Sequence, residues 1–198
     1  MFEKLKRYWK KIKEYNRIAN IEEMARRYFA MNSFDGLLTI IGVIVGNFIA
    51  KVNDPKIIIS TGLGVSIAMG ISGIWGTYLT EEAERKKKLI ELEKITLSDL
   101  NNTKIAKAEK TATILISLID GLSPFLAAFL TISPFFFINL IGINTAYYFA
   151  IGIAFALLLV IGSFLGHISK ENIVIWGLKM VLAGIVCTGL IILLGVPV

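Results

Sequence analysis

The sequence has very little cysteine and little charge for its length. Its 198 residues include a single cysteine, Cys187, and a single histidine. One cysteine excludes a disulfide framework and a zinc centre built from several cysteines. Charged residues make up 18% of the chain and hydrophobic residues 55%, whereas a soluble domain is about a quarter charged. Together with a mean hydropathy of +0.69, this composition argues against a water-soluble single domain.

Common enzyme motifs are also missing from the chain. The sequence contains no glycine-rich phosphate loop, no nucleophile elbow and no paired catalytic carboxylates, so we do not expect an enzyme. A formal charge of +6 is compatible with a nucleic-acid partner. The basic residues lie beside apolar segments instead of in a separate domain, so membrane orientation explains them better and no nucleic-acid partner is expected.

Long apolar segments are what the sequence does contain. A bilayer core of about 30 Å needs roughly 20 apolar residues per helix, and five segments meet this length. They cover residues 33–50, 57–79, 111–132, 145–166 and 173–194. We therefore expect an all-α integral membrane protein that crosses the lipid bilayer through five transmembrane helices. The expected divisions are a cytoplasmic amphipathic helix at 1–31, helices 1 and 2 at 32–80, a short charged helical segment at 81–110, and helices 3 to 5 at 111–198.

The distribution of basic residues predicts the orientation. Nine Lys and Arg residues precede the first span and eight lie within residues 81–110, but only Lys51 and Lys56 lie between the first and second spans. By the positive-inside rule, the N-terminus and residues 81–110 are cytoplasmic and the C-terminus is outside or lumenal. The protein is expected in the cell membrane, or in a vacuolar membrane if it is eukaryotic.

Two water-exposed segments are expected beside the spans. In the N-terminal segment, Phe2, Leu5 and Trp9 share one helical face opposite many lysines, which predicts a helix in the membrane interface. The alternative is a helix that packs on another cytoplasmic segment. In residues 81–110, we expect the second span to continue as a helix, turn near Ser98, and rise again from about Thr103.

Two carboxylates, Asp35 and Asp120, fall inside apolar segments. An aspartate in hydrocarbon costs about 2.5 to 3.5 kcal/mol on insertion scales, so each is expected to face water or the bundle interior and to have a partner. Asp120 has Ser117, Ser123 and Pro124 near it on the helix, and the proline removes a backbone hydrogen bond there. The alternative for each aspartate is a structural cap or a hydrogen bond to a neighbouring helix.

Small and polar residues follow one face of the second span at spacings of three and four. They are Gly62, Ser66, Met69, Gly73, Gly76, Thr77 and Thr80. Such a face lets another helix backbone approach closely, and tight packing of this kind also fits Gly42 with Gly46 and Gly162 with Gly166. A thioether at Met69 beside a carboxylate at Asp35 would instead form a mixed soft and hard ligand set, suited to a transition-metal cation.

Several stretches resemble the vacuolar iron transporter (VIT) family. Residues 32–39, NSFDGLLT, continuing to VIVG at 43–46, resemble the first-span motif of that family. Residues 76–80, GTYLT, resemble its Gly-Glu-Tyr-Leu-Ser stretch. LSPF at 122–125 with SPF at 133–135 resembles the third span, and GLKM at 177–180 resembles the last. The resemblance covers about residues 32 to 195, and the order of five spans agrees.

This resemblance implies a homodimeric transporter that moves Fe²⁺, and often Mn²⁺ or other divalent ions, out of the cytosol in exchange for protons. Carried over, Asp35 is the membrane carboxylate of the ion path. The family usually has a methionine and a glutamate where this chain has Gly73 and Thr77, so Met69, one turn away, is the candidate sulfur ligand. Four cytoplasmic carboxylates are expected to gather ions: Glu81, Glu84, Glu91 and Glu109.

The resulting hypothesis is a divalent-metal transporter of VIT-like fold. Asp35 binds the cation and exchanges protons, Met69 is a softer ligand facing it, and Asp120 is a second carboxylate or a proton relay. The first span is expected to pair with its two-fold mate along Gly42 and Gly46. The metal ion is the substrate, and no cofactor is expected. The alternatives are a non-transporting membrane assembly protein and a transporter of another cationic solute.

Overall fold

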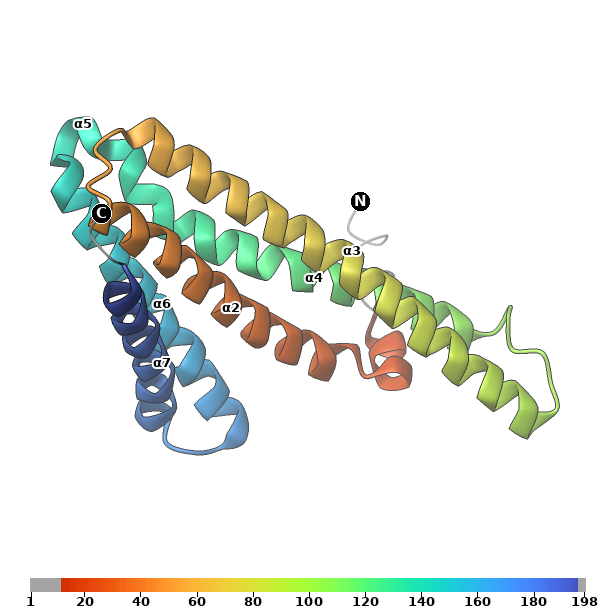
Figure 1. Ribbon diagram of the computed structural model, residues 1–198. Helices are drawn as coiled ribbons and strands as arrows, with labels where there is room; N and C mark the ends of the chain where they lie inside the picture. Colours follow the sequence, from red (N-terminus) through yellow and green to blue (C-terminus); the bar gives the residue numbers. More distant parts are fainter. Residues whose placement is uncertain (1–11, 196–198) are drawn as a thin grey trace, which may run out of the picture. The chain divides into compact units, whose positions relative to one another are not determined.

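The computed structural model describes residues 12–195, which are almost entirely helical (Figure 1). Residues 12–19 form a short helix. The remaining elements are α2 (Ile21–Ile49), α3 (Pro55–Thr96), α4 (Lys104–Ile132), the 3-10 helix η1 (Ser133–Phe137), α5 (Ile138–Ile141), α6 (Ile143–Ser169) and α7 (Ile173–Leu194). The described part of the chain contains no strand.

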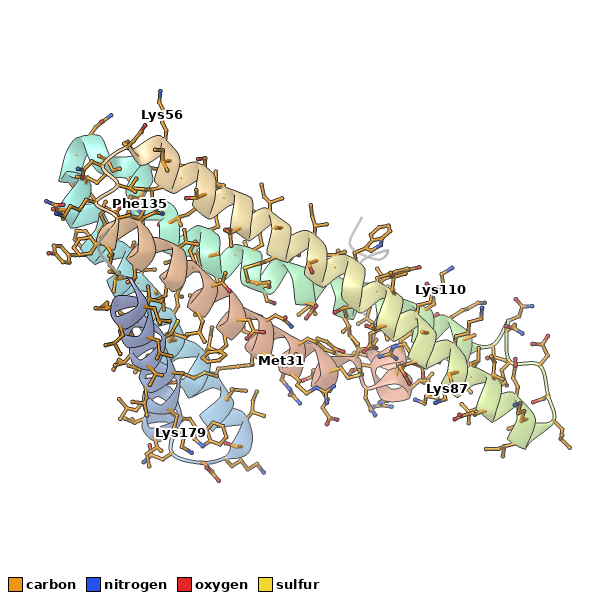
Figure 2. The ribbon with its side chains drawn as sticks, viewed as in Figure 1. Met31, Lys56, Lys87, Lys110, Phe135 and Lys179 are labelled. Atoms are coloured by element: carbon orange, nitrogen blue, oxygen red, sulfur yellow. The ribbon has the colours of Figure 1, made fainter. Side chains whose placement is uncertain are left out.

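Five helical segments are long and apolar enough to cross a membrane. They are Ile21–Ile49, Pro55–Thr96, Lys104–Ile141, Ile143–Ser169 and Ile173–Leu194. Large apolar side chains cover their outer faces, and Trp75 of α3, for example, is 66% exposed. Side chains project outward from every one of these helices (Figure 2). Extended apolar surface of this kind is stable in contact with lipid. The prediction of an all-α, multi-pass membrane protein with five transmembrane helices is confirmed.

The chain divides into two compact units. The hairpin unit comprises Met1–Phe29 and Ile71–Leu122, and the bundle unit comprises Ala30–Gly70 and Ser123–Val198. In the hairpin unit, the second half of α3 and the first half of α4 run antiparallel beside each other (Figure 1). The bundle unit contains α2 from Ala30 onward, α3 up to Gly70, α4 from Ser123 onward, and the helices α6 and α7.

In the hairpin unit, the helical structure of the N-terminal segment is interrupted at Asn20. Asn20 has a φ of 49°, a left-handed conformation that asparagine adopts more readily than most residues. Helix α2 begins directly after it and continues without interruption to Ile49. The expected apolar face at Phe2, Leu5 and Trp9 lies outside the described residues.

The described part of the N-terminal segment packs on α4. Its buried residues Ala19 and Ile21 form one core with Ala108, Ala112 and Ile116. Apolar burial against another helix therefore positions the described part of this segment.

The turn between α3 and α4 lies where the sequence predicts it. Helix α3 ends at Thr96, and Leu97 follows with a φ of 53°. The Asp99 carboxylate accepts a hydrogen bond of 2.9 Å from the backbone N–H of Asn101. This bond lowers the pKa of the Asp99 carboxyl because it stabilises the ionised form. The Thr103 hydroxyl then accepts from the backbone N–H of Ala106 at the start of α4.

Aromatic and aliphatic residues fill the core of the bundle unit near α5. Phe135, labelled in Figure 2, is 1% exposed and meets the Tyr147 ring edge to face, with 5.0 Å between ring centroids. The Tyr147 hydroxyl donates to the backbone carbonyl of Val52 at 2.8 Å. Gly142 separates α5 from α6 with a φ of 76°, a conformation that favours glycine.

Helices α6 and α7 pack closely through glycines. A Cβ atom added to Gly162 would lie 2.5 Å from the backbone oxygen of Trp176, and one added to Gly177 would lie 3.2 Å from the backbone oxygen of Leu159. A side chain at position 162 would therefore overlap the α7 backbone, and one at position 177 would be crowded. The packing explanation for Gly162 is therefore confirmed.

Candidate functional site

The two halves of the hairpin unit meet through glycine and then through a buried hydrogen bond. A Cβ atom added to Gly73 of α3 would lie 2.8 Å from the Cα atom of Gly121 of α4. One turn further along α3, the Thr77 hydroxyl donates to an Asp120 carboxylate oxygen at 2.5 Å, and both residues are buried. Close helix approach therefore gives Asp120 a partner on the neighbouring helix, which is the structural role considered as its alternative.

A cluster of buried charges follows two turns along the same face of α3. The Arg85 guanidinium donates from Nε to Glu81 at 2.8 Å and from a terminal nitrogen to Glu109 of α4. The three side chains are only 7 to 9% exposed. Lys88 also pairs with Glu109, at 3.2 Å. Because charges out of water are stable only when they are paired, this cluster ties α3 to α4.

The N-terminal segment also contributes to this cluster. The Tyr28 hydroxyl donates to Glu81 at 2.9 Å, and the Arg85 guanidinium contacts the Met24 sulfur at 3.1 Å. Three separate stretches of the hairpin unit therefore meet around one arginine. Sequence reasoning missed this role of Arg85, although its spacing of four residues after Glu81 is the signal of a helical ion pair.

Further buried polar side chains recur on α3 and α4 between the Asp120 hydrogen bond and the ion cluster, and we call the whole set the polar seam. Its members are Thr77, Glu81 and Arg85 of α3, and Glu109, Thr113, Ser117 and Asp120 of α4. From Glu109 to Asp120 the helix rises about 16 Å at 1.5 Å per residue. Chains of polar groups of this kind within membrane proteins mark ion or proton pathways as well as structural contacts.

The four glutamates expected to gather metal ions are not brought together. Glu81 and Glu109 are already paired with Arg85, whereas Glu84 and Glu91 are exposed on α3. Within residues 12–195, no group of three or more His, Cys, Asp or Glu side chains is placed to hold a metal ion. A single copy of this part of the chain therefore offers no complete carboxylate cage.

Asp35 lies in the bundle unit and points outward from α2. Its neighbour Gly36 packs on α4, where an added Cβ atom would lie 2.7 Å from the Cα atom of Pro124. Successive helical residues point about 100° apart, so this contact turns the Asp35 side chain away from the core. Asp35 is exposed, and its carboxylate has no hydrogen-bond or ion-pair partner within residues 12–195. Its backbone oxygen accepts a hydrogen bond from the Thr39 hydroxyl at 2.8 Å.

The outward face of α2 continues from Asp35 along small residues. Asp35, Thr39, Gly42 and Gly46 follow one another at spacings of four, three and four. A Cβ atom added to Gly46 would meet no atom within 4 Å, and one added to Gly42 would meet only the Ile191 side chain at 3.7 Å. Little of the described chain covers this face, which we call the α2 face.

The other expected ligands and small residues divide between packing and open positions. Met69 is half-buried on α3 and makes no hydrogen bond with Asp35. Gly62 is packed, since an added Cβ atom would lie 2.9 Å from the Ile132 side chain, and the buried Ser66 hydroxyl donates to the Gly62 carbonyl at 2.6 Å. Gly76, in contrast, has no atom within 4 Å of an added Cβ. The predicted continuous face of the second span is therefore two faces, one buried and one open.

Comparison with known proteins shows a clear relative. The chain is 40% identical over 162 residues to the uncharacterized protein MJ0645 of Methanocaldococcus jannaschii, a match that covers 80% of this chain and 82% of the archaeal protein. This chain belongs to the MJ0645 family. No family model matches it, and no solved structure matches it.

Proposed function

We propose that this protein is a homodimeric transporter of divalent transition-metal cations, of the Fe²⁺ or Mn²⁺ type, that exports them from the cytosol in exchange for protons. The single observation that supports this proposal most strongly is Asp35, an exposed carboxylate on an apolar helix that has no partner among residues 12–195. The resemblance of residues 32–39 to the first span of the VIT family supports the same function.

A carboxylate that faces lipid costs about 2.5 to 3.5 kcal/mol on insertion scales. The α2 face is therefore more stable when another protein surface covers it. A second copy of the chain meets this need, because Gly42 and Gly46 are open and allow two helix backbones to approach closely. Two-fold pairing brings a second Asp35 near the first. Two carboxylates together neutralise one divalent cation, which a single described copy does not do.

Proton exchange follows from the chemistry of carboxylates. A metal ion and a proton compete for the same carboxylate oxygens, so binding one releases the other. Asp35 can serve both tasks at the α2 face. In the hairpin unit, Asp120 and Thr77 supply a buried hydrogen bond at one end of the polar seam, and we propose that this seam relays protons.

We propose that the protein lies in the cell membrane with residues 81–110 on the cytoplasmic side. The eight basic residues of this segment support it, because basic residues are retained on the cytoplasmic side during insertion.

Uptake by proteoliposomes tests the transport proposal. Purified protein is reconstituted with a metal-quenched dye inside, and Mn²⁺, Fe²⁺, Zn²⁺ and Ca²⁺ are added with and without an imposed pH gradient. We expect quenching by Mn²⁺ or Fe²⁺ that depends on the gradient, and its loss in the Asp35→Asn variant. Asp99→Asn is the matched control, because Asp99 lies in the exposed turn outside the spans. Uptake by Asp35→Asn at the unaltered rate would exclude Asp35 as the site.

A non-transporting assembly protein is the second candidate function. The pairing of Asp120 with Thr77 and of two glutamates with Arg85 favours it, because these polar groups already serve helix contacts. This candidate predicts no uptake of any tested cation, together with an intact dimer in the Asp35→Asn variant. Gradient-dependent uptake by the unaltered protein would rule it out.

A further inference from the structure

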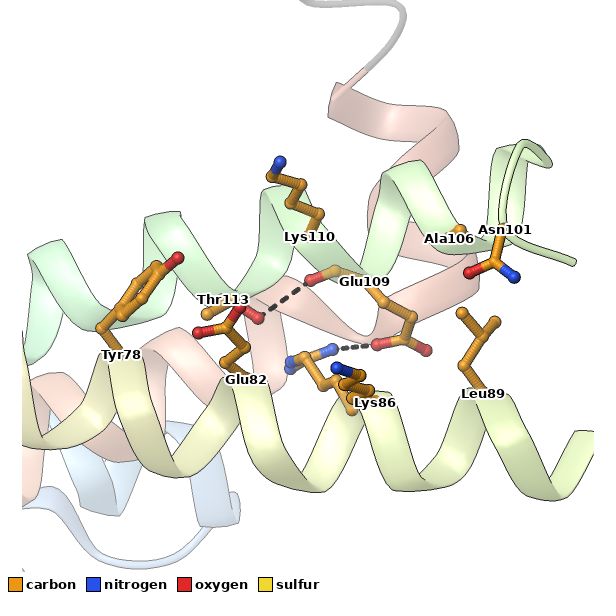
Figure 3. Close-up of a pocket in the computed structure, with 10 residues that line it drawn as sticks. Tyr78, Glu82, Lys86, Leu89, Asn101, Ala106, Glu109, Lys110 and Thr113 are labelled. Atoms are coloured by element: carbon orange, nitrogen blue, oxygen red, sulfur yellow. Dashed lines mark hydrogen bonds and ion pairs between the residues drawn. The ribbon is translucent and has the colours of Figure 1, made fainter.

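A groove opens between α3 and α4 in the hairpin unit, next to the Arg85–Glu109 ion pair. Its volume is about 260 Å³ (Figure 3). Tyr78 lines one end, in the last apolar turn of α3, and Lys86 lies two turns further along the same helix. Apolar sequence gives way to charge between these two residues, so the groove begins at the depth where lipid headgroups meet the protein.

The unpaired charges in the groove are mainly positive. Arg85 and Glu109 neutralise each other within the ion cluster. Lys86, Lys110 and Glu82 also line the groove, and none of them has a hydrogen-bond or ion-pair partner in the part of the chain that the structure describes. The lining residues without a described partner therefore carry two positive charges and one negative charge, which leaves an excess of one positive charge.

The lining side chains reach the groove from both helices. In Figure 3, Lys86 lies beside Glu109 at the groove, whereas Lys110 points away from α3. Lys110 is exposed, and rotation about its side-chain bonds brings its ammonium over the opening while its stem stays on α4. The Tyr78 hydroxyl, also without a partner among residues 12–195, adds a neutral donor at the membrane end.

We propose that this groove binds an anionic phosphate group. Lys86 and Lys110 would donate to the phosphate oxygens and Tyr78 would add a hydrogen bond. An anionic phospholipid headgroup and free phosphate share this chemistry. The headgroup enters from the membrane end, so that its acyl chains pass Tyr78 into the bilayer. Basic pockets between helices at the membrane surface bind lipid headgroups in this way.

The charge of the groove also argues against a cation as its ligand. Of the two carboxylates that line it, Glu109 is already held by Arg85 and Lys88. Glu82 alone remains, and Lys86 and Lys110 line the same groove. Glu82 therefore weakens anion binding, and its removal gives a test whose sign differs between an anion site and a cation site.

Lipid binding by the full-length protein in detergent tests the proposal. The dissociation constant of dioleoylphosphatidylglycerol is measured by native mass spectrometry, and inorganic phosphate is added as a competitor. Lys86→Gln and Lys110→Gln should each weaken binding about fivefold, and Glu82→Gln should strengthen it by a similar factor. Lys87→Gln and Lys107→Gln make the same charge change on the same helices outside the groove, and they should leave binding unchanged.

The outcomes separate the two sources of phosphate. Competition by inorganic phosphate, with the same dependence on Lys86, identifies a site that also takes the free ion. Lipid binding that phosphate does not displace identifies a headgroup site. Both results support the proposal. Equal weakening of lipid binding by Lys86→Gln and Lys87→Gln would overturn the proposal, and so would weaker lipid binding by Glu82→Gln. Oleate has no phosphate, so oleate binding that is as tight as lipid binding and depends on Lys86 would overturn it too. Asp35→Asn should bind the lipid normally, because this site is independent of cation transport.

Discussion

At the scale of single residues, Arg85 shows that a buried charged side chain has a different structural role from an exposed one. In the sequence it is one of eight basic residues in a charged segment. In the structure its guanidinium lies between the carboxylates of Glu81 and Glu109, away from water. Its planar group presents several donors at once, which lysine does not. The stability of the hairpin unit therefore depends on this one side chain more than on its exposed neighbours.

We predict that Arg85→Met destabilises the protein by about 3 to 5 kcal/mol, because two buried carboxylates lose their shared cation. Lys88→Gln is the control. Lys88 reaches Glu109 from an exposed position, so its loss should cost no more than about 1 kcal/mol. Thermal unfolding in detergent measures both.

A rescue variant shows whether unpaired charge causes the loss. Replacing Glu81 and Glu109 with glutamine in the Arg85→Met background removes the buried charges, and we expect it to recover most of the stability. Equal unfolding midpoints for Arg85→Met and Lys88→Gln would contradict the role assigned to Arg85.

At the scale of elements, the contact between α3 and α4 depends on two glycines that face each other. Gly73 meets Gly121 backbone to backbone, whereas Gly76, three residues later on α3, faces open space. Sequence spacing put both residues in one small-residue face, but the helix turns them toward different surroundings.

We predict that Gly73→Ala destabilises the protein by about 1 to 3 kcal/mol, because its methyl group would overlap the Gly121 backbone and push α3 from α4. Gly76→Ala should be neutral or slightly stabilising, since alanine favours the helix and meets no atom. Unfolding by sodium dodecyl sulfate followed by circular dichroism compares the two. A Gly76→Ala protein less stable than Gly73→Ala would contradict this assignment.

At the scale of the whole molecule, the exposed α2 face connects assembly with the proposed transport. A Cβ atom added to Gly46 would meet no atom within 4 Å among residues 12–195, so a larger side chain there should leave each chain folded. If the α2 face is where two copies meet, the same side chain separates them.

We predict that Gly46→Leu gives a folded monomer without cation uptake, because leucine prevents close approach at the α2 face. Gly189→Leu on α7 is the matched control, since Gly189 is equally open in one copy. Light scattering in detergent and metal uptake are measured on the same preparations. A Gly46→Leu protein that stays dimeric and transports normally would place the interface elsewhere.

The orientation of the molecule gives a separate prediction. In a Cys187→Ser background, a cysteine at Asn102 should react with an impermeant reagent only from the cytoplasmic side, and one at Val198 only from the opposite side. The eight basic residues of 81–110 against the two between the first spans provide the reason. Labelling of position 198 from the cytoplasm would refute this topology.

The sequence alone determined the number and positions of the spanning helices, because a helix that crosses a bilayer must be apolar over a length that matches the thickness of the bilayer core. It also determined the turn near Ser98, since Asn, Asp and Thr side chains satisfy backbone groups locally. Both are properties of contiguous residues, and the surroundings need not be known to infer them.

Only the tertiary structure decided which polar groups meet. Asp35 and Asp120 look alike in the sequence, each a carboxylate in an apolar segment. In the structure Asp120 is buried against Thr77, whereas Asp35 is exposed and has no partner in the described part of the chain. The contact of Gly36 with Pro124 turns one outward, and the approach of Gly73 to Gly121 lets the other find its donor. Such outcomes depend on the distance between helices that are far apart in the chain, which no local pattern encodes.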